Sequence, residues 1–230
     1  MKNKIITIML ALVALSFASC EKETEGVTGI TIYPVLELDG ETTLYLEKGS
    51  TFEDPGYTAT LDGEDVTDQV VIDSNVNMNA SGFYSISYKI TNKDGFSASD
   101  SRKVIVLDPN DDIDGFYTVT ANSYRFYKDA TVEYGDEYEI IVAHDNDKLY
   151  FSDALAGWYA QRANYGDAYE MFATIGIDSD NNLSLISSLI PGWGDGLVGF
   201  SGSWDSTNKT FTYVAKYVSG MTFYVTLTKE

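Results

Sequence analysis

Two stretches in the second half of the sequence carry large aromatic rings among glycine and polar residues. Residues 157–167 read GWYAQRANYGD, and residues 191–196 read PGWGDG. Long loops on a rigid scaffold are where binding groups concentrate. Flat rings can cover the apolar face of a sugar, while amide, guanidinium and carboxylate groups bond its hydroxyls. The candidate ligand-binding residues are therefore Trp158, Tyr159, Gln161, Arg162, Asn164, Asp167, Trp193 and Asp195.

The same rings have a structural alternative. Tryptophan is highly buried on average, so Trp158 and Trp193 could instead fill the ends of a β domain as core residues. Four other rings lie within strand-like runs, and this pattern predicts that they belong to the core. They are Trp204, Phe211, Tyr213 and Phe223.

Catalytic chemistry has little support in the sequence. His144 is the one histidine, and no serine lies in the Gly-x-Ser-x-Gly spacing of a nucleophile elbow. We therefore expect a solvated histidine at a strand end, no catalytic residues and no enzyme activity. A small glycoside hydrolase, which needs only two carboxylates, stays open as a less favoured alternative because the chain has 35 acidic residues.

Two acidic runs imitate calcium loops. Asn110, Asp112, Asp114 and Gly115 have the spacing of loop positions 1, 3, 5 and 6, but the twelfth residue is alanine where a bidentate glutamate is needed. Residues 178–189 have leucine at the sixth and twelfth positions. Turns favour Asp and Asn for backbone reasons alone. The sequence therefore predicts no metal site, and we expect no cofactor.

The amino-acid composition restricts the classes of molecule that the protein could bind. The 230 residues include 15 Lys+Arg and 35 Asp+Glu, which gives a formal net charge of −20. This charge argues against nucleic acid as a partner and favours neutral over anionic ligands. The single cysteine excludes an internal disulfide.

The first 20 residues have the pattern of an export signal. Lys2 and Lys4 precede an apolar run that ends before the small residues at 18 and 19. The segment FASC at 17–20 resembles a bacterial lipobox, although Phe17 stands where leucine is usual. The resemblance implies a signal peptide over residues 1–19 and a fatty-acylated Cys20, which would be a stable lipid anchor in the membrane.

Residues 20–26 form an acidic tether. The segment EKETE after the cysteine resembles the export signal of surface lipoproteins in the Bacteroidetes. That resemblance implies an outer-membrane lipoprotein exposed at the cell surface. A flexible solvated tether is the plainer interpretation, and the two are compatible.

The remaining sequence reads as two β units, since short β-branched and aromatic runs recur between turn residues. The polar run at 108–113 is the expected linker between unit 27–107 and unit 114–230. In the first unit, the strict alternation of Tyr84, Ile86, Tyr88 and Ile90 predicts a half-buried strand, and a turn should follow with Gly95 at positive φ. The strands expected there are residues 29–35, 42–46, 56–61, 69–72, 82–91 and 96–107.

The first unit also carries a family pattern. Its segments EKGSTFEDPGYTA at 47–59 and GFYSISY at 82–88, followed by Arg102-x-Val104-x-Val106, resemble a bacterial immunoglobulin-like domain. Domains of this family occur as spacer and adhesive modules in surface proteins, including insecticidal crystal proteins. The resemblance implies a β-sandwich without catalytic residues.

The second unit should contain about eight antiparallel strands. They are expected at residues 115–121, 137–143, 148–152, 169–177, 182–189, 199–204, 210–217 and 222–228, which fits a closed barrel or a sandwich. Its layout resembles the C-terminal domains of Bacteroidetes lipoproteins, some of which are lipocalin-like barrels. The expected fold class is thus all-β.

Function follows from these parts. We expect a lipid-anchored surface protein whose first domain is a spacer and whose second domain binds a neutral glycan or another extracellular ligand. The alternative is a structural or adhesive protein that joins an uptake or adhesion assembly of the outer membrane through an exposed strand edge or apolar patch.

Overall fold

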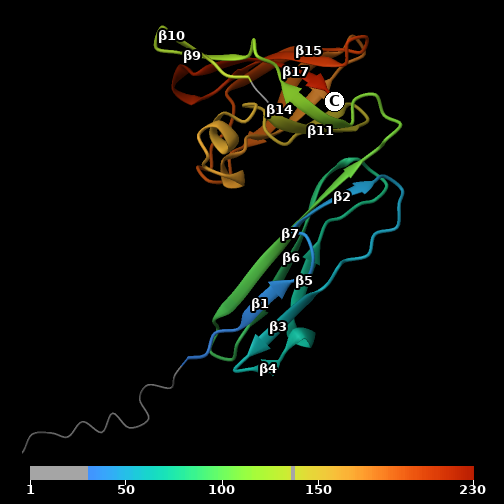
Figure 1. The fold of residues 1–230 in the computed structure, drawn as a ribbon, viewed down its shortest axis with the longest axis vertical. Helices are drawn as coiled ribbons and strands as arrows, with labels where there is room; N and C mark the ends of the chain where they lie inside the picture. The colour runs from blue at the N-terminus through green and yellow to red at the C-terminus, as the bar shows by residue number, and fades with distance from the viewer. Residues whose placement is uncertain (1–30, 136–137) are drawn as a thin grey trace, which may run out of the picture.

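A computed structural model describes residues 31–135 and 138–230. The predicted signal peptide, Cys20 and the acidic tether lie outside these residues. Figure 1 shows the described chain as two β domains, with the first in blue to green and the second in green to red. Within the described residues, no helix has the length and apolar character needed to cross a membrane. The predicted all-β class is confirmed.

The first domain is a sandwich of two small sheets. One sheet has the order β1-β3-β4, formed by β1 (Val35–Leu38), β3 (Tyr57–Leu61) and β4 (Glu64–Asp65). The other has the order β2-β7-β6-β5. Its strands are β2 (Thr43–Glu47), β5 (Val71–Ser74), β6 (Gly82–Thr91) and β7 (Ser97–Leu107). A short 3-10 turn, η1 (Thr67–Gln69), connects β4 to β5.

Alternation along β6 builds the core of this sandwich. Ile86, Tyr88 and Ile90 are at most 2% exposed, while the residues between them face solvent. Gly95 has a φ of 87° in the turn that leads to β7, as the sequence predicted. The first strand starts later than expected, because residues 31–34 are not paired and β1 begins at Val35.

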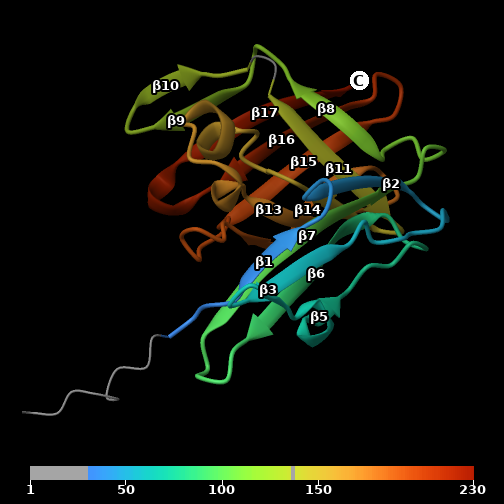
Figure 2. The ribbon, with the colours of Figure 1, turned by 60° about the horizontal axis from the view of Figure 1, so that its bottom comes forward.

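The second domain is a closed barrel. Eight antiparallel strands follow one another around it, and β17 pairs with β8 to close the ring. Figure 2 shows these two strands side by side. The strands are β8 (Gly115–Val119), β11 (Glu139–Asp145), β12 (Lys148–Phe151), β13 (Phe172–Ile177), β14 (Asn182–Leu189), β15 (Gly199–Asp205), β16 (Thr210–Lys216) and β17 (Thr222–Lys229). The choice between barrel and sandwich is thereby settled.

A further hairpin extends the barrel wall. It consists of β9 (Tyr124–Tyr127) and β10 (Ala130–Glu133), and β9 pairs with the first half of β17. The sequence did not predict it. Lys128 and Asp129 form its turn with φ values of 50° and 58°. Hairpin turns with positive φ at both central residues are usually recognised by an Asn-Gly pair, which is absent from this turn.

Side chains fill the barrel. Trp204, Phe211, Tyr213 and Phe223 are at most 5% exposed, as their pattern predicted. The ring of Phe211 lies 5.2 Å from that of Phe151 and 4.5 Å from that of Trp204. The barrel core is therefore a close-packed aromatic cluster.

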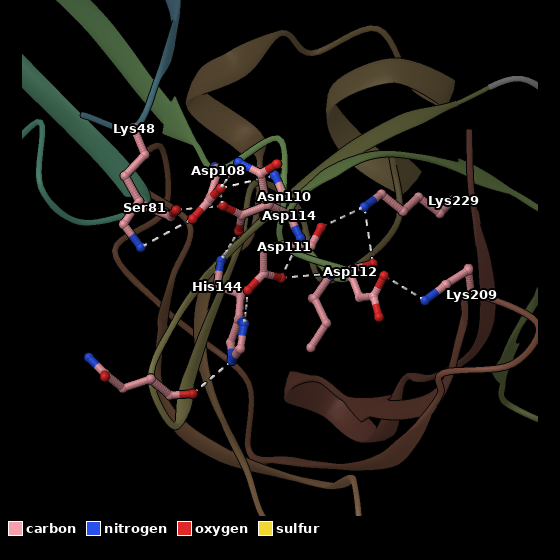
Figure 3. Close-up of polar contacts among 12 residues, drawn as sticks. Lys48, Ser81, Asp108, Asn110, Asp111, Asp112, Asp114, His144, Lys209 and Lys229 are labelled. Atoms are coloured by element: carbon pink, nitrogen blue, oxygen red, sulfur yellow. Dashed lines mark hydrogen bonds and ion pairs between the residues drawn. The ribbon is translucent and has the colours of Figure 1, made fainter. Parts of the chain in front are cut away.

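Polar contacts hold the two domains together at the connection from β7 to β8 (Figure 3). Asp114 is 4% exposed, and its carboxylate accepts hydrogen bonds from the Ser81 hydroxyl and from the backbone N–H groups of Asp108 and His144. Burial is the main reason that the pKa of Asp114 is raised. Ser81 belongs to the first domain and His144 to the barrel, so one buried carboxylate binds both domains to the connection.

Candidate functional site

The long connection between β12 and β13 is fixed at both ends by one buried acid. Asp153 is 1% exposed, and its carboxylate accepts hydrogen bonds from the backbone N–H groups of Leu155, Gly157 and Met171. Burial raises the pKa of Asp153 to about 6. Within this connection lie a π-helical turn, η2 (Trp158–Arg162), and a 3-10 turn, η3 (Asp167–Tyr169).

Trp158 belongs to the core. It is 6% exposed and meets the rings of Tyr134 and Phe223 edge to face, at 4.9 and 5.7 Å between centroids. The guanidinium carbons of Arg125 and Arg162 lie 4.5 and 4.4 Å from its ring centroid. These contacts leave Trp158 no open face on which a sugar could stack.

Trp193 lies at the surface. It is 44% exposed, in a loop that the Ile190–Asp195 bridge closes at its base. The N–H of Gly192 donates to the carbonyl of Ala168 over 2.7 Å and joins this loop to η3. A Cβ on Gly192 would lie 2.7 Å from the ring of Tyr169, so the approach of the two loops requires glycine.

The joined loops gather four aromatic rings. Trp193 lies 4.7 Å from Tyr159, 4.9 Å from Tyr169 and 6.2 Å from Tyr165 between ring centroids. Tyr165 is 55% exposed. Tyr165, Tyr169 and Trp193 line an open hollow of about 340 Å³, which we call the aromatic hollow. It is the arrangement closest to the stacking site that the sequence suggested.

Asp195 is the acid of the loop that carries Trp193. One of its carboxylate oxygens, Oδ1, accepts a hydrogen bond from the Tyr217 hydroxyl over 2.7 Å. Burial, and then this bond to Asp195, raise the pKa of Tyr217. Asp195 is therefore held in place at the base of the loop that carries Trp193.

The other predicted site residues are dispersed. Gln161 donates to the carbonyl of Glu139 over 2.9 Å, Arg162 covers Trp158, and Asp167 lies 3.6 Å from the Lys103 ammonium. Asn164 is exposed, with a φ of 57°. The structure thus brings Tyr159, Trp193 and Asp195 into one region. The other predicted ligand-binding residues lie outside this region.

The predicted set of ligand-binding residues left out three residues of this region: Tyr165, which lies in the 157–167 stretch, Tyr169 and Tyr217. Tyr169 was assigned to a strand over 169–177, whereas η3 contains it and β13 begins at Phe172. An aromatic residue in a predicted strand is expected to belong to the core, so Tyr169 was not predicted as an aromatic residue of a binding loop.

His144 is not the solvated side chain that the sequence predicted, because both of its ring nitrogens have polar partners. Its Nδ1 lies 2.9 Å from the Asp111 carboxylate, and its Nε2 lies 2.7 Å from the carbonyl of Asn146. Figure 3 shows His144 beside Asp111 at this contact. The ring therefore belongs to the domain junction. Among residues 31–135 and 138–230, no group of three or more His, Cys, Asp or Glu side chains is arranged to hold a metal ion.

Comparisons with known proteins fit this architecture. A family model described as the Ig-like domain of a bacterial surface protein matches residues 36–106, and a model for a C-terminal domain matches residues 107–229. The crystal structure of the lipoprotein BT2262 from Bacteroides thetaiotaomicron is 33% identical, with a TM-score of 0.60. That alignment covers 86% of this chain and all of the lipoprotein chain.

A Clostridium perfringens structure, CBM51-2 in complex with GlcNAc and INT domains of ZmpB, aligns at 14% identity with a TM-score of 0.28. That alignment covers 84% of this chain and 43% of the other. Such a score carries no argument about this protein. No curated protein matches the chain.

Proposed function

Because the chain belongs to the same family as the lipoprotein BT2262 of Bacteroides thetaiotaomicron, we propose that it is anchored through Cys20 in the outer membrane and exposed at the cell surface. The lipobox-like segment at 17–20 and the acidic tether support this placement. Acylation of the cysteine would hold both β domains outside the cytoplasm.

On this surface, we propose that the barrel binds a neutral glycan without transforming it. The observation that carries the proposal is the aromatic hollow, in which Tyr165, Tyr169 and Trp193 present partly exposed rings on two joined loops. Aromatic faces beside a few polar groups are the chemistry that small-ligand sites use. Asp195, two residues after Trp193 in the same loop, is the candidate acceptor for a sugar hydroxyl.

Charge supports a neutral ligand. A protein with a net charge of −20 repels anionic polysaccharides at low ionic strength. Stacking and hydroxyl contacts, by contrast, are insensitive to salt. Binding that stays constant between low and moderate salt would therefore agree with a neutral glycan.

The experiment is affinity electrophoresis and glycan-array binding of the intact protein. Trp193→Ala and Tyr165→Ala should each weaken binding about tenfold, the loss expected for one aromatic contact. The matched control is Tyr224→Ala, which removes a ring that is 37% exposed on β17 and stacks on Tyr124 outside the hollow. Unchanged binding in both hollow variants would overturn the proposal.

A second candidate function is adhesion within a surface assembly. β5 is the last strand of its sheet, and its Val71 and Ile72 are 69% and 47% exposed. An apolar edge strand can pair with a strand of a partner protein. Lys substitutions at both positions should then abolish co-purification with an outer-membrane partner and leave glycan binding intact.

A further inference from the structure

A second hollow, of about 290 Å³, lies between the two domains. We call it the interdomain hollow. Its charged and aromatic lining comes from both domains and includes Tyr45, Phe83, Lys103, Glu139, Asp167 and Glu170. Domain interfaces are a preferred location for small-molecule sites. The aromatic hollow has none of these residues in its lining, so the two hollows are separate sites.

Negative charge dominates this hollow. Three carboxylates, on Glu139, Asp167 and Glu170, face one ammonium. The Lys103 Nζ lies 3.6 Å from Asp167 Oδ2 and 3.6 Å from Glu170 Oε2, so a single positive charge is shared between two acids at more than hydrogen-bond distance. With all four groups ionised, the hollow would accept a further cation.

Glu170 is the most buried of the three acids. Its side chain is 16% exposed, and its Oε2 is buried without a hydrogen bond from any described residue. Burial is the main reason that its pKa is raised to about 7, against the attraction of Lys103. A buried carboxylate oxygen without a hydrogen-bond donor is costly, and a cationic ligand at the exposed part of the Glu170 side chain would offset that cost electrostatically.

Aromatic rings next to these acids suit a cation. The Lys103 ammonium already lies 5.7 Å from the ring centroid of Phe172. Phe172 in turn meets Phe83 of the first domain edge to face, at 6.4 Å between centroids. A ring face beside a carboxylate attracts an ammonium group by both electrostatic and cation–π interaction.

The lining also contains neutral polar groups. The hydroxyl of Thr43 and the phenol of Tyr45 can bond a hydroxylated ligand. The volume is at the lower end for small-molecule sites, which fits one sugar-sized ring. Acids, rings and hydroxyls in this volume together select a small polyhydroxylated amine.

We propose that the interdomain hollow is a second ligand site for small hydroxylated amines of the amino-sugar class, and that the ligand's ammonium pairs with the Glu170 carboxylate. Because residues of both domains line the hollow, such a ligand bridges the immunoglobulin-like domain and the barrel. This site is independent of the proposed glycan site, since it uses other residues and a charged ligand.

Calorimetric or saturation-transfer NMR titration of the intact protein at pH 7 tests the proposal. The probe is glucosamine, with glucose and N-acetylglucosamine as neutral rings of the same shape. Glucosamine should bind at least about tenfold more tightly than either neutral sugar, since an ammonium–carboxylate hydrogen bond is charge-assisted. Glu170→Gln keeps the shape of the side chain and should remove this preference. Glu133→Gln, at an exposed acid on β10, is the matched control and should not.

Two results would overturn the proposal. One is equal binding of glucosamine and glucose to the unaltered protein, and the other is a glucosamine preference that survives in Glu170→Gln. Thermal melting of each variant establishes that it is folded, and Glu139→Gln, on the barrel side of the same hollow, provides a second test of the charge requirement. Trp193→Ala should leave glucosamine binding unchanged. Loss in that variant would assign the amine to the aromatic hollow and contradict the interdomain site.

Discussion

The ring of Trp193 stands at 88° to the ring of Tyr165, with 6.2 Å between their centroids. The two rings therefore form a corner instead of a flat platform. A platform of coplanar aromatic rings suits successive sugar residues of a linear glycan. Two perpendicular aromatic rings instead cover one face and one edge of a single sugar ring. The geometry favours a terminal or branching sugar residue as the part of the glycan that is bound.

The corner predicts how binding depends on chain length. A monosaccharide, a disaccharide and a tetrasaccharide with the same terminal residue should bind within about threefold of one another, because the stacking contact is confined to one ring. Isothermal titration of such a series measures this. Affinity that rises more than tenfold with each added residue would instead indicate an extended site and would contradict the corner.

Placement of the two tryptophans shows where sequence reasoning reaches its limit. Both lie next to glycine in long loops, so their local sequences are alike. Trp158 is turned inward by contacts with Tyr134, Phe223 and Arg125, all of which are distant in sequence. Such tertiary contacts leave no local signal, whereas the alternation that predicted β6 and the core rings of β16 and β17 is local.

Gly192 supports a prediction about how the aromatic hollow is assembled. Gly192→Ala should weaken glycan binding about tenfold with little loss of stability, because the new methyl group would collide with the Tyr169 ring and separate the two loops. Binding and melting temperature, measured together, check this. Gly194→Ala is the control, because no atom lies within 4 Å of its Cβ position, although its φ of 73° adds some strain. Equal effects of the two changes would show that the loop contact is unimportant.

An ion pair with a buried arginine links two parts of the immunoglobulin-like sequence pattern, the DPG segment at 54–56 and Arg102 of the last strand. Arg102 is fully buried, with its Nε 3.6 Å from Asp54 Oδ1. Its Nη2 donates to the carbonyls of Asp39 and Gly56 over 2.9 and 3.0 Å. The guanidinium thus binds the β1 and β3 ends to β7. The sequence resemblance identified these residues, but their mutual contact is apparent only in the folded chain.

Arg102→Lys should destabilise the first domain by about 3 kcal/mol, since an ammonium cannot reproduce the planar fork and leaves carbonyls without donors. All three tryptophans lie in the barrel, so their fluorescence reports the second domain alone. Urea unfolding followed by circular dichroism should shift to lower concentration, while the fluorescence transition moves less. Lys89→Met, at an exposed position of β6, is the control. Coincident shifts of both probes would mean that the domains unfold as one unit.

Asp114, the buried acid at the connection between the domains, gives a prediction about how the two domains are coupled. Asp114→Asn keeps the shape of the side chain but turns an amide N–H₂ toward groups that are donors, at a cost of about 1–3 kcal/mol. Proteolysis within residues 108–113 should accelerate because the connection is released. Asp112→Asn is the control, since that side chain is 78% exposed and pairs with Lys209 at the surface. Identical cleavage rates in the two variants would remove Asp114 from this role.

Two buried acids determine how stability should depend on pH. Burial raises the pKa of Glu170 to about 7 and that of Asp153 to about 6, above their ordinary values of 4.5 and 3.8. Between about pH 4 and pH 7 the folded chain therefore holds protons that the unfolded chain has released. Stability must fall as pH rises through this window, by an amount on the order of 1–3 kcal/mol.

Melting temperature measured from pH 5 to pH 8 checks this sign. The unaltered protein should melt at a higher temperature at pH 5 than at pH 8, and Glu170→Gln should flatten the upper part of the curve, between pH 6 and pH 8. Repulsion among the many surface carboxylates acts in the same direction, so the difference between the two curves, not either slope alone, isolates Glu170. Glucosamine should oppose the fall, because a bound ammonium favours the ionised form of Glu170. A curve for Glu170→Gln parallel to that of the unaltered protein would show that Glu170 ionises without cost.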